Sequence, residues 1–207
     1  MFGNKGYYER YALNVLKMVY DEKYKYLLHT ENDAPDWKGT INFNCGLEVT
    51  RAISSEQGAN QRFAQNCFDR GLSYGELKKL IKNYPKVSIK LNETSGFSWF
   101  CEERDKQVQI SQVIGSINNK LNKLNKNTNY SIYESNELFL FLETGLLKYD
   151  DILCIIDGVD SKYKRQYDKI FMMGEDSLYV TIKRNISKIC LTDFQLLELK
   201  TQSNPND

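Results

Sequence analysis

The chain has 207 residues, of which 41% are hydrophobic and 13% aromatic. This length fits one domain, or one domain with an elaboration, and the apolar fraction argues against a disordered chain. A net charge of +1 excludes a protein that wraps nucleic acid with a polycationic surface, and no run approaches the ~18 apolar residues of a membrane-spanning helix.

The N-terminal quarter of the chain is expected to contain a helix and a strand. Apolar residues recur at helical spacing from Tyr7 to about Tyr26, which predicts an amphipathic helix. A turn near Pro35 separates it from two β-prone runs at residues 40–44 and 46–53. In the second run, alternation places Glu48, Thr50 and Ala52 on one face and Leu47, Val49 and Arg51 on the other.

Helices and strands are expected to alternate through the rest of the chain. Apolar periodicity and caps predict helices from about residue 56, at residues 74–83 (capped by Ser73), 105–125 and 145–157. Strands are predicted at residues 87–91, 97–101 and 137–142, followed by a hairpin of residues 169–173 and 177–182. This order predicts a mixed α/β single domain over residues 1–201, with residues 202–207 as a flexible tail. No G-x-G-x-x-G or G-x-x-x-x-G-K-[ST] motif occurs, which disfavours Rossmann and P-loop folds.

Cysteine and histidine usage narrows the chemistry. His29 is the single histidine, and the five cysteines are widely spaced, with no CxxC pair. These counts disfavour structural zinc, a disulfide framework and Ser-His or Cys-His hydrolases, and reduced cysteines favour a cytoplasmic protein. An enzyme with this composition is expected to use carboxylates, which suit a hard metal ion.

Three carboxylates are candidates for such a site. Asp36 follows Pro35 at a bend, and Glu48 lies twelve residues later in the predicted strand, so a tight turn between strands would bring the two together. Glu9 shares the core-facing stripe of the first helix, where an unpaired charge is costly and a divalent cation would compensate for it. Each residue also has an ordinary structural interpretation: Glu9 favours a helix N-terminus, Asp36 a turn, and Glu48 a solvated strand face.

This pattern resembles that of the PD-(D/E)xK nuclease superfamily over about residues 7–53, through Glu9, Pro35-Asp36 and Glu48-Val49-Thr50. The resemblance implies a restriction-endonuclease-like α/β fold, a mixed sheet flanked by helices. It implies a metal-dependent nuclease that hydrolyses phosphodiester bonds, of DNA in preference to RNA. It also implies a Mg²⁺ or Mn²⁺ ion held by Glu9, Asp36, Glu48 and the carbonyl of Val49. Residues 46–52 further resemble bacterial and phage proteins of this type that carry Glu-Val-Thr.

The chain departs from the family pattern at Thr50, the third catalytic candidate beside Asp36 and Glu48. The family has a lysine there that helps to activate the attacking water, and Arg51 points to the opposite face of the strand. The resemblance therefore implies a lysine displaced to a neighbouring helix, with Arg62, Lys78 or Lys79 as the donor. The alternative is a catalytically degenerate nuclease-fold protein that binds a protein partner, such as a phage-encoded inhibitor of a host defence complex.

Two acid-free groups of lysines are candidates for phosphate contacts. The first is predicted to bind nucleic acid through Lys78, Lys79, Lys82 and Lys86, and the second consists of Lys120, Lys123 and Lys126. A solvated helix face is the alternative interpretation of both groups. Nucleic acid or a protein is therefore the expected partner, a membrane is not, and the sequence leaves a monomer and a homodimer open.

Overall fold

The computed structural model describes residues 5–30, 35–40, 43–54, 58, 60, 63–64, 67, 71–83, 90–92, 96–98, 105–126, 130, 133–142 and 147–204. Contacts divide the chain into two compact units. The larger, called here the sheet unit, comprises Gly3–Ala52 and Gln109–Asp207. The smaller comprises Met1–Phe2 and Ile53–Val108. Its main segment, Ile53–Val108, interrupts the sheet unit in sequence and is called here the inserted unit.

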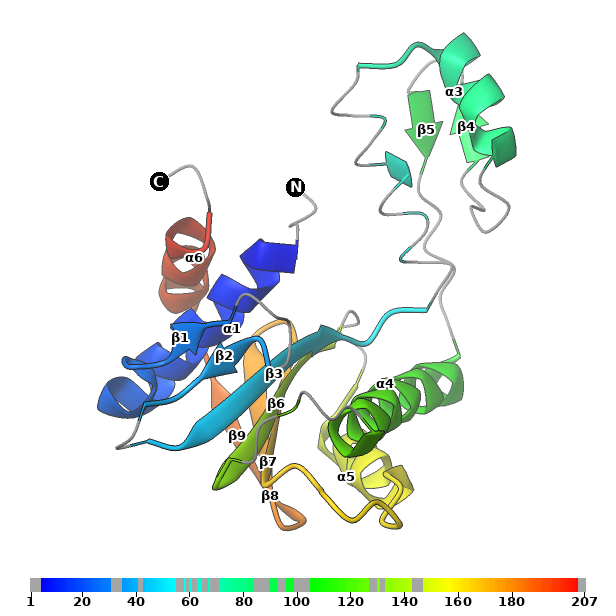
Figure 1. Cartoon of the computed structure of the whole chain (residues 1–207). Coiled ribbons are helices and arrows are strands. Elements are labelled where there is room, and N and C mark those ends of the chain that lie inside the picture. The colour runs from blue at the N-terminus through cyan, green and yellow to red at the C-terminus, as the bar shows by residue number, and fades with distance from the viewer. Residues whose placement is uncertain are drawn as a thin grey trace. The chain divides into compact units, whose positions relative to one another are not determined.

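A seven-stranded mixed sheet forms the centre of the sheet unit (Figure 1). Its strands, in spatial order, are β1 (Leu28–His29), β2 (Trp37–Lys38), β3 (Cys45–Arg51), β6 (Ser135–Phe141), β7 (Lys169–Met173), β8 (Ser177–Ile182) and β9 (Asn185–Cys190). β3, β6 and β7 run parallel to one another, and the other neighbouring pairs are antiparallel. Parallel neighbours need a crossover, which α4 (Lys106–Lys126) and α5 (Tyr149–Gly158) provide here.

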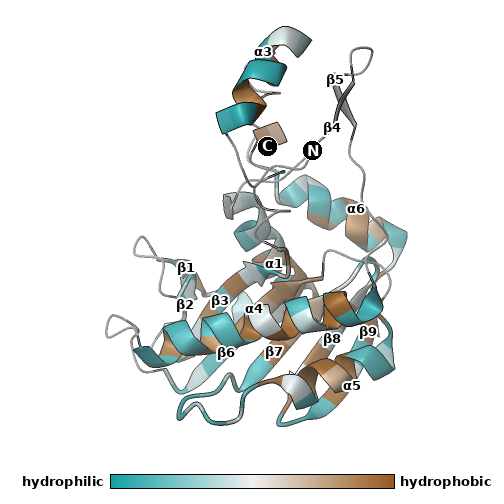
Figure 2. Ribbon diagram, turned by 90° about the vertical axis from the view of Figure 1, so that its right-hand side faces the viewer, coloured by the Kyte–Doolittle hydropathy of each residue, from teal (hydrophilic) through white to brown (hydrophobic). Residues whose placement is uncertain are grey.

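Helices cover both faces of this sheet. α1 (Lys5–Tyr20), which continues into the 3-10 turn η1 (Asp21–Tyr24), lies with α6 (Asp193–Gln202) on one face, and α4 and α5 lie on the other (Figure 1). Side chains alternate along each strand, so that Val49 packs in the cluster that contains α1, whereas Leu138 packs with α4 and α5. Hydrophobic and hydrophilic residues alternate along α4 (Figure 2), as expected for a helix that covers a sheet with one side. Glu48 follows the same alternation and points to the α4 face.

The inserted unit contains α3 (Tyr74–Leu80), the 3-10 turn η2 (Ile81–Asn83) and the antiparallel pair β4 (Lys90–Asn92) and β5 (Gly96–Ser98). Ser73 caps α3, because its backbone amide and its hydroxyl both donate to the Glu76 carboxylate, at 2.9 and 2.6 Å. A small buried core consists of Phe63, Ala64, Cys67 and Leu77. The cap predicted at Ser73 is therefore confirmed.

The mixed α/β class is confirmed, and most predicted elements are present with shifted ends. α4, β6 and the β7–β8 hairpin match the predictions, whereas the first helix ends at Tyr20 and η1 replaces its last predicted turn. β9 and α6 are not among the predicted elements, although the capping box of Thr192 and Gln195 marks the start of α6. The predicted helix from about residue 56 and the predicted strands at 87–91 and 97–101 lie partly outside the described residues.

The C-terminal part of the described chain contacts α1. Arg10 Nε donates to the carbonyl of Ser203 at 3.1 Å and Asn14 Nδ2 to its hydroxyl at 3.2 Å, so this part of the predicted tail is in contact with α1. A single domain over residues 1–201 stays a prediction, because an insertion into one domain also produces two compact units. No helix in the described ranges is both long and apolar enough to cross a membrane.

A buried ion pair lies on the α1 face where β6 and β7 begin. Glu137 is 0% exposed, and its carboxylate accepts hydrogen bonds from Lys169 Nζ (2.7 Å), the Tyr24 hydroxyl (2.7 Å) and the Ser135 hydroxyl (3.1 Å). Lys169 stands directly opposite Glu137 in the β6–β7 pairing. These donors compensate for the burial of the carboxylate, which is costly for an unpaired charge.

Candidate functional site

Asp36 lies at the bend before β2, and its carboxylate is attached to the middle of β3. Its Oδ2 accepts a hydrogen bond from the Val49 amide at 2.6 Å, and the side chain is 2% exposed. β2 contains only Trp37 and Lys38, which pair with Leu47 and Gly46, so no residue of β2 pairs with Val49. The Asp36 carboxylate thus takes the place of a backbone acceptor and is fixed against β3.

Glu48 is the second buried carboxylate, 1% exposed, on the α4 face of β3. Its Oε1 accepts hydrogen bonds from Lys120 Nζ at 2.5 Å and from Lys123 Nζ at 3.2 Å. Its Oε2 accepts a hydrogen bond from the hydroxyl of Tyr130. Residues three apart lie on one side of a helix, so the two lysines reach the same oxygen.

The negative charges of Asp36 and Glu48 repel each other. The pKa of the Asp36 carboxyl is raised to about 6, first by burial and then by the neighbouring charge of Glu48, whereas the Val49 amide and Lys120 act in the opposite direction. Burial and the Glu48 charge also raise the pKa of the Tyr130 hydroxyl, which therefore stays protonated and donates. The structure thus brings these two predicted carboxylates together, with an ammonium beside them.

Glu9 is buried on α1, as predicted, and is 5% exposed. Its Oε2 lies 3.0 Å from Nε2 of His29, whose ring makes an edge contact with Trp37 at a centroid distance of 5.0 Å. α1 covers the face opposite to that of Glu48, and Glu9 contributes the smallest of the charges that raise the pKa of Asp36. The charge of Glu9 therefore acts weakly on Asp36 from the other side of the sheet, and its own contact is with His29, which sequence reasoning missed.

Val49 and Thr50 occupy their predicted positions. Val49 packs into the cluster on the α1 face, and its amide bonds to Asp36; its carbonyl as a metal ligand stays a prediction. Thr50 is half-buried on the face of Glu48 and supplies no positive charge. Arg51 points the other way, as predicted, and its guanidinium lies 4.2 Å from the centre of the Tyr8 ring on α1.

The lysines in contact with Glu48 are not those predicted from the sequence. Lys78 and Lys79 are exposed on α3, and Lys82 is exposed on η2, all in the inserted unit; Arg62 and Lys86 lie outside the described residues. The contact with Glu48 comes instead from α4, through the second lysine group. Lys120 lies three residues after Ile117 and four before Leu124, both buried, so it borders the apolar stripe of the helix. That position was the signal that this lysine faces the sheet.

The pair of carboxylates fits a hard divalent cation in its chemistry. Mg²⁺ is commonly held by one or two carboxylates and keeps several waters, and Asp36 and Glu48 repel each other in a way that a cation would relieve. Among the residues that the structure describes, no three His, Cys, Asp or Glu side chains are grouped as a metal site. An ion at this site would be held by Asp36 and Glu48, while Glu9, the third predicted ligand, lies on α1 at the opposite face of the sheet.

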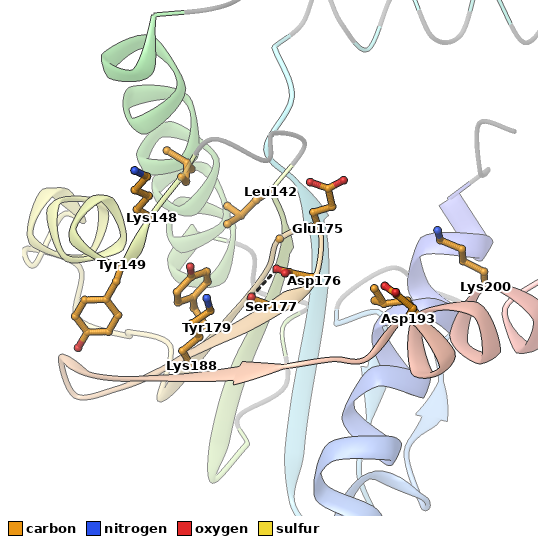
Figure 3. A pocket seen from close by; sticks show the side chains of 13 residues that line it. Leu142, Lys148, Tyr149, Glu175, Asp176, Ser177, Tyr179, Lys188, Asp193 and Lys200 are labelled. Atoms are coloured by element: carbon orange, nitrogen blue, oxygen red, sulfur yellow. Dashed lines mark hydrogen bonds between the residues drawn. The ribbon is translucent and has the colours of Figure 1, made fainter.

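A cavity of about 660 Å³ lies elsewhere, where β6 and β7 end (Figure 3). Figure 3 shows side chains of both charges around it, among them Lys148, Glu175, Asp193 and Lys200. None of the predicted site residues lines this cavity. The candidate site is therefore the Asp36–Glu48 region and not this cavity.

Comparison with family models, with curated proteins and with solved structures finds no match for this chain. The chemistry of the site is therefore inferred from its residues alone. Those residues are two buried carboxylates, a lysine pair from α4 and a tyrosine, all in the sheet unit.

Proposed function

We propose that this chain is a metal-dependent nuclease that hydrolyses phosphodiester bonds, of DNA in preference to RNA, at Asp36 and Glu48. The contact of Lys120 with Glu48, beside Asp36, carries the proposal, because it supplies the ammonium that Thr50 lacks. Two carboxylates with one ammonium are the groups that metal-assisted phosphodiester hydrolysis uses. The mixed sheet with helices on both faces supports a restriction-endonuclease-like fold.

Each residue of the site has a role in this proposal. Asp36 and Glu48 would hold Mg²⁺ or Mn²⁺, which, when bound, polarises the phosphate and lowers the pKa of a water. Lys120 places its ammonium next to the reacting phosphate, where it stabilises the negative charge that develops. Tyr130 orients Glu48 by donating to Oε2, and Thr50 lies on the same face, where its hydroxyl can orient water.

A second function, a degenerate nuclease fold that binds a protein partner, is favoured by the state of Glu48. Both of its oxygens already accept hydrogen bonds, from Lys120 and Lys123 on one side and Tyr130 on the other. Such a carboxylate must release a donor before it can bind a cation. In the degenerate protein these bonds would be structural and permanent.

Cleavage assays on supercoiled plasmid and on single-stranded and duplex oligonucleotides of DNA and RNA test the proposal. We expect cleavage with Mg²⁺ or Mn²⁺ and none with a chelator, with DNA cut faster than RNA. A protein that cuts no substrate with either metal would overturn the nuclease proposal and leave the binding function.

Mn²⁺ at millimolar concentration is expected to raise the melting temperature of the wild type by about 2–8 °C, because a ligand that binds the folded state stabilises it. The shift should vanish as the pH falls below about 6, where Asp36 becomes protonated. Calorimetry would compare Glu48→Gln, which should lose the shift, with Glu175→Gln, an exposed carboxylate that should keep it. An equal shift in both variants would place the metal elsewhere.

A further inference from the structure

Basic side chains gather at the end of the sheet unit where β6 and β7 begin. Lys169 at the start of β7 pairs with Ile182 at the end of β8, so the hairpin tip of Lys183 and Arg184 lies at this end (Figure 1). The last turn of α4 reaches the same end, because Arg165, shortly before β7, bonds to it. The amide of Arg165 donates to Asn125 Oδ1, and Asn125 Nδ2 donates to the Arg165 carbonyl, both at 2.9 Å.

The segment before β7 is fixed next to the candidate site. Nη1 of Arg165 donates to the carbonyl of Leu124 at 3.1 Å, and Nη2 to Asn136 Oδ1 at 3.3 Å. Two residues later, the Tyr167 hydroxyl donates to the carbonyl of Lys120, at 3.4 Å. Lys120 is the residue whose ammonium contacts Glu48. This segment and the candidate site thus share one helix.

Exposed side chains at this end include five basic ones, together with the carboxylates of Glu134 and Asp168. The five that define the surface, called here the basal lysine surface, are Lys126, Lys162, Lys164, Lys183 and Arg184. None of them forms an ion pair with another residue that the structure describes. The nearby carboxylates are those of Glu134, Asp160 and Asp168, of which Asp160 and Asp168 accept backbone amide hydrogen bonds at 2.9 and 2.8 Å. The five cations therefore outnumber these carboxylates. Charge complementarity therefore favours a polyanion here.

The hairpin tip keeps its basic residues in a costly backbone conformation. Lys183 and Arg184 have φ values of 47° and 71°, in the left-handed region. A two-residue hairpin turn with two positive φ values favours Asn-Gly, and other residues there cost of order 1 kcal/mol each. Two charged side chains at the tip thus occur where Asn-Gly would be more stable.

We propose that the basal lysine surface binds the phosphate backbone of the nucleic-acid substrate and leads it to Lys120 and Glu48. This inference rests on the proposed nuclease function and names the surface that function uses. The surface belongs to the same unit as the site, whereas Lys78, Lys79 and Lys82 belong to the inserted unit. Phosphate contacts of this kind carry no base specificity, so the surface binds any sequence.

Fluorescence anisotropy with a labelled DNA duplex, in the presence of a chelator, tests the surface without cleavage. The test variant is Lys162→Glu/Lys164→Glu, since both side chains are exposed and the fold does not depend on them. The matched control is Lys148→Glu/Lys200→Glu, which makes the same charge change at the cavity of Figure 3. A third variant, Lys78→Glu/Lys79→Glu, changes the inserted unit.

At about 0.1 M salt the test variant is expected to bind at least about tenfold more weakly, with a salt dependence lower by about 2 units of slope. The matched control should lose less than about threefold. Equal losses in both variants, unchanged binding by the test variant, or loss confined to Lys78→Glu/Lys79→Glu would overturn the inference. So would a wild type that binds neither DNA nor RNA, which would point to a protein partner.

These outcomes are distinguishable from failure of the nuclease proposal. A wild type that binds through the basal lysine surface but cuts nothing with Mg²⁺ or Mn²⁺ supports the surface and overturns the nuclease. A wild type that cuts while Lys162→Glu/Lys164→Glu binds and cuts equally well supports the nuclease and overturns the surface.

Discussion

Asp36→Asn is expected to abolish metal-dependent cleavage and at the same time to stabilise the metal-free protein. Cleavage should fall by about 10³-fold or more, because an amide is a poor ligand for a hard cation and leaves Glu48 to hold it alone. The fold should persist, since an Asn side-chain oxygen can still accept the hydrogen bond of the Val49 amide.

The stabilisation follows from the raised pKa of Asp36. In the folded protein this carboxyl has a pKa of about 6, above the ordinary value near 4 of an unfolded chain. The folded state therefore binds the proton more tightly, and stability is lost as the pH rises from about 4 through about 6. Asp36→Asn removes this loss, so its free energy of unfolding at about pH 8 should exceed that of the wild type by roughly 2–3 kcal/mol.

Urea unfolding of both proteins across this pH range, without metal, measures the difference. It should shrink as the pH falls and approach zero below about pH 3, where the wild-type carboxyl is protonated in both states. A variant that cuts as fast as the wild type would show that the metal is held elsewhere. A variant that is less stable than the wild type at every pH would show that burial and the charge of Glu48 do not destabilise the ionised carboxylate.

Lys120→Met is expected to lower the cleavage rate by about 10²-fold, because it removes the ammonium beside the reacting phosphate. Lys123 and Tyr130 still donate to Glu48 in this variant, so the carboxylate stays compensated. Lys200→Met on α6 makes the same chemical change on an exposed helix position and should cut at the wild-type rate.

Thr50→Lys then tests whether the role of Lys120 can be moved back to the strand. Alone, it should give an enzyme no faster than the wild type, because two ammonium groups would crowd one site. Combined with Lys120→Met, it should recover a substantial part of the lost rate, since position 50 lies on the face of Glu48. Single-turnover rates of the four proteins give the comparison. If neither the wild type nor Lys120→Met cuts and Thr50→Lys alone creates weak cleavage, the wild-type site lacks an activating lysine and the protein is catalytically degenerate.

The meeting of Asp36 and Glu48 could be predicted from local rules. A strand alternates with period 2, which assigned Glu48 and Thr50 to one face, and a tight turn before that strand lets the segment after Asp36 pair with it. These rules act over a dozen residues. They are therefore readable without knowledge of the tertiary structure, and the same holds for the β7–β8 hairpin.

The lysine donor could not be identified in this way. Lys120 and Glu48 are 72 residues apart, and their contact depends on which face of the sheet the α4 crossover covers. Helical periodicity shows that Lys120 borders a buried stripe, but not which strand that stripe packs against. For the same reason the partner of Glu9 was missed, because β1 contains two residues and gives no strand pattern from which His29 could be placed.

The inserted unit lengthens the crossover from β3 to β6, and this length affects the entropy cost of bringing the two strands together. The contact of Glu48 with Lys120 closes a loop of 72 residues, most of which belong to the inserted unit. The entropy of closure grows only with the logarithm of loop length, so such an insertion raises its cost by about 1 kcal/mol over a direct crossover. The parallel pairing of β3 with β6 is more remote in sequence than the contacts of α1 with β3 and so is expected to form later than they do in folding. The length and content of this crossover are therefore weakly constrained by stability, and the insertion is a place where the chain can change without loss of the β3–β6 pairing.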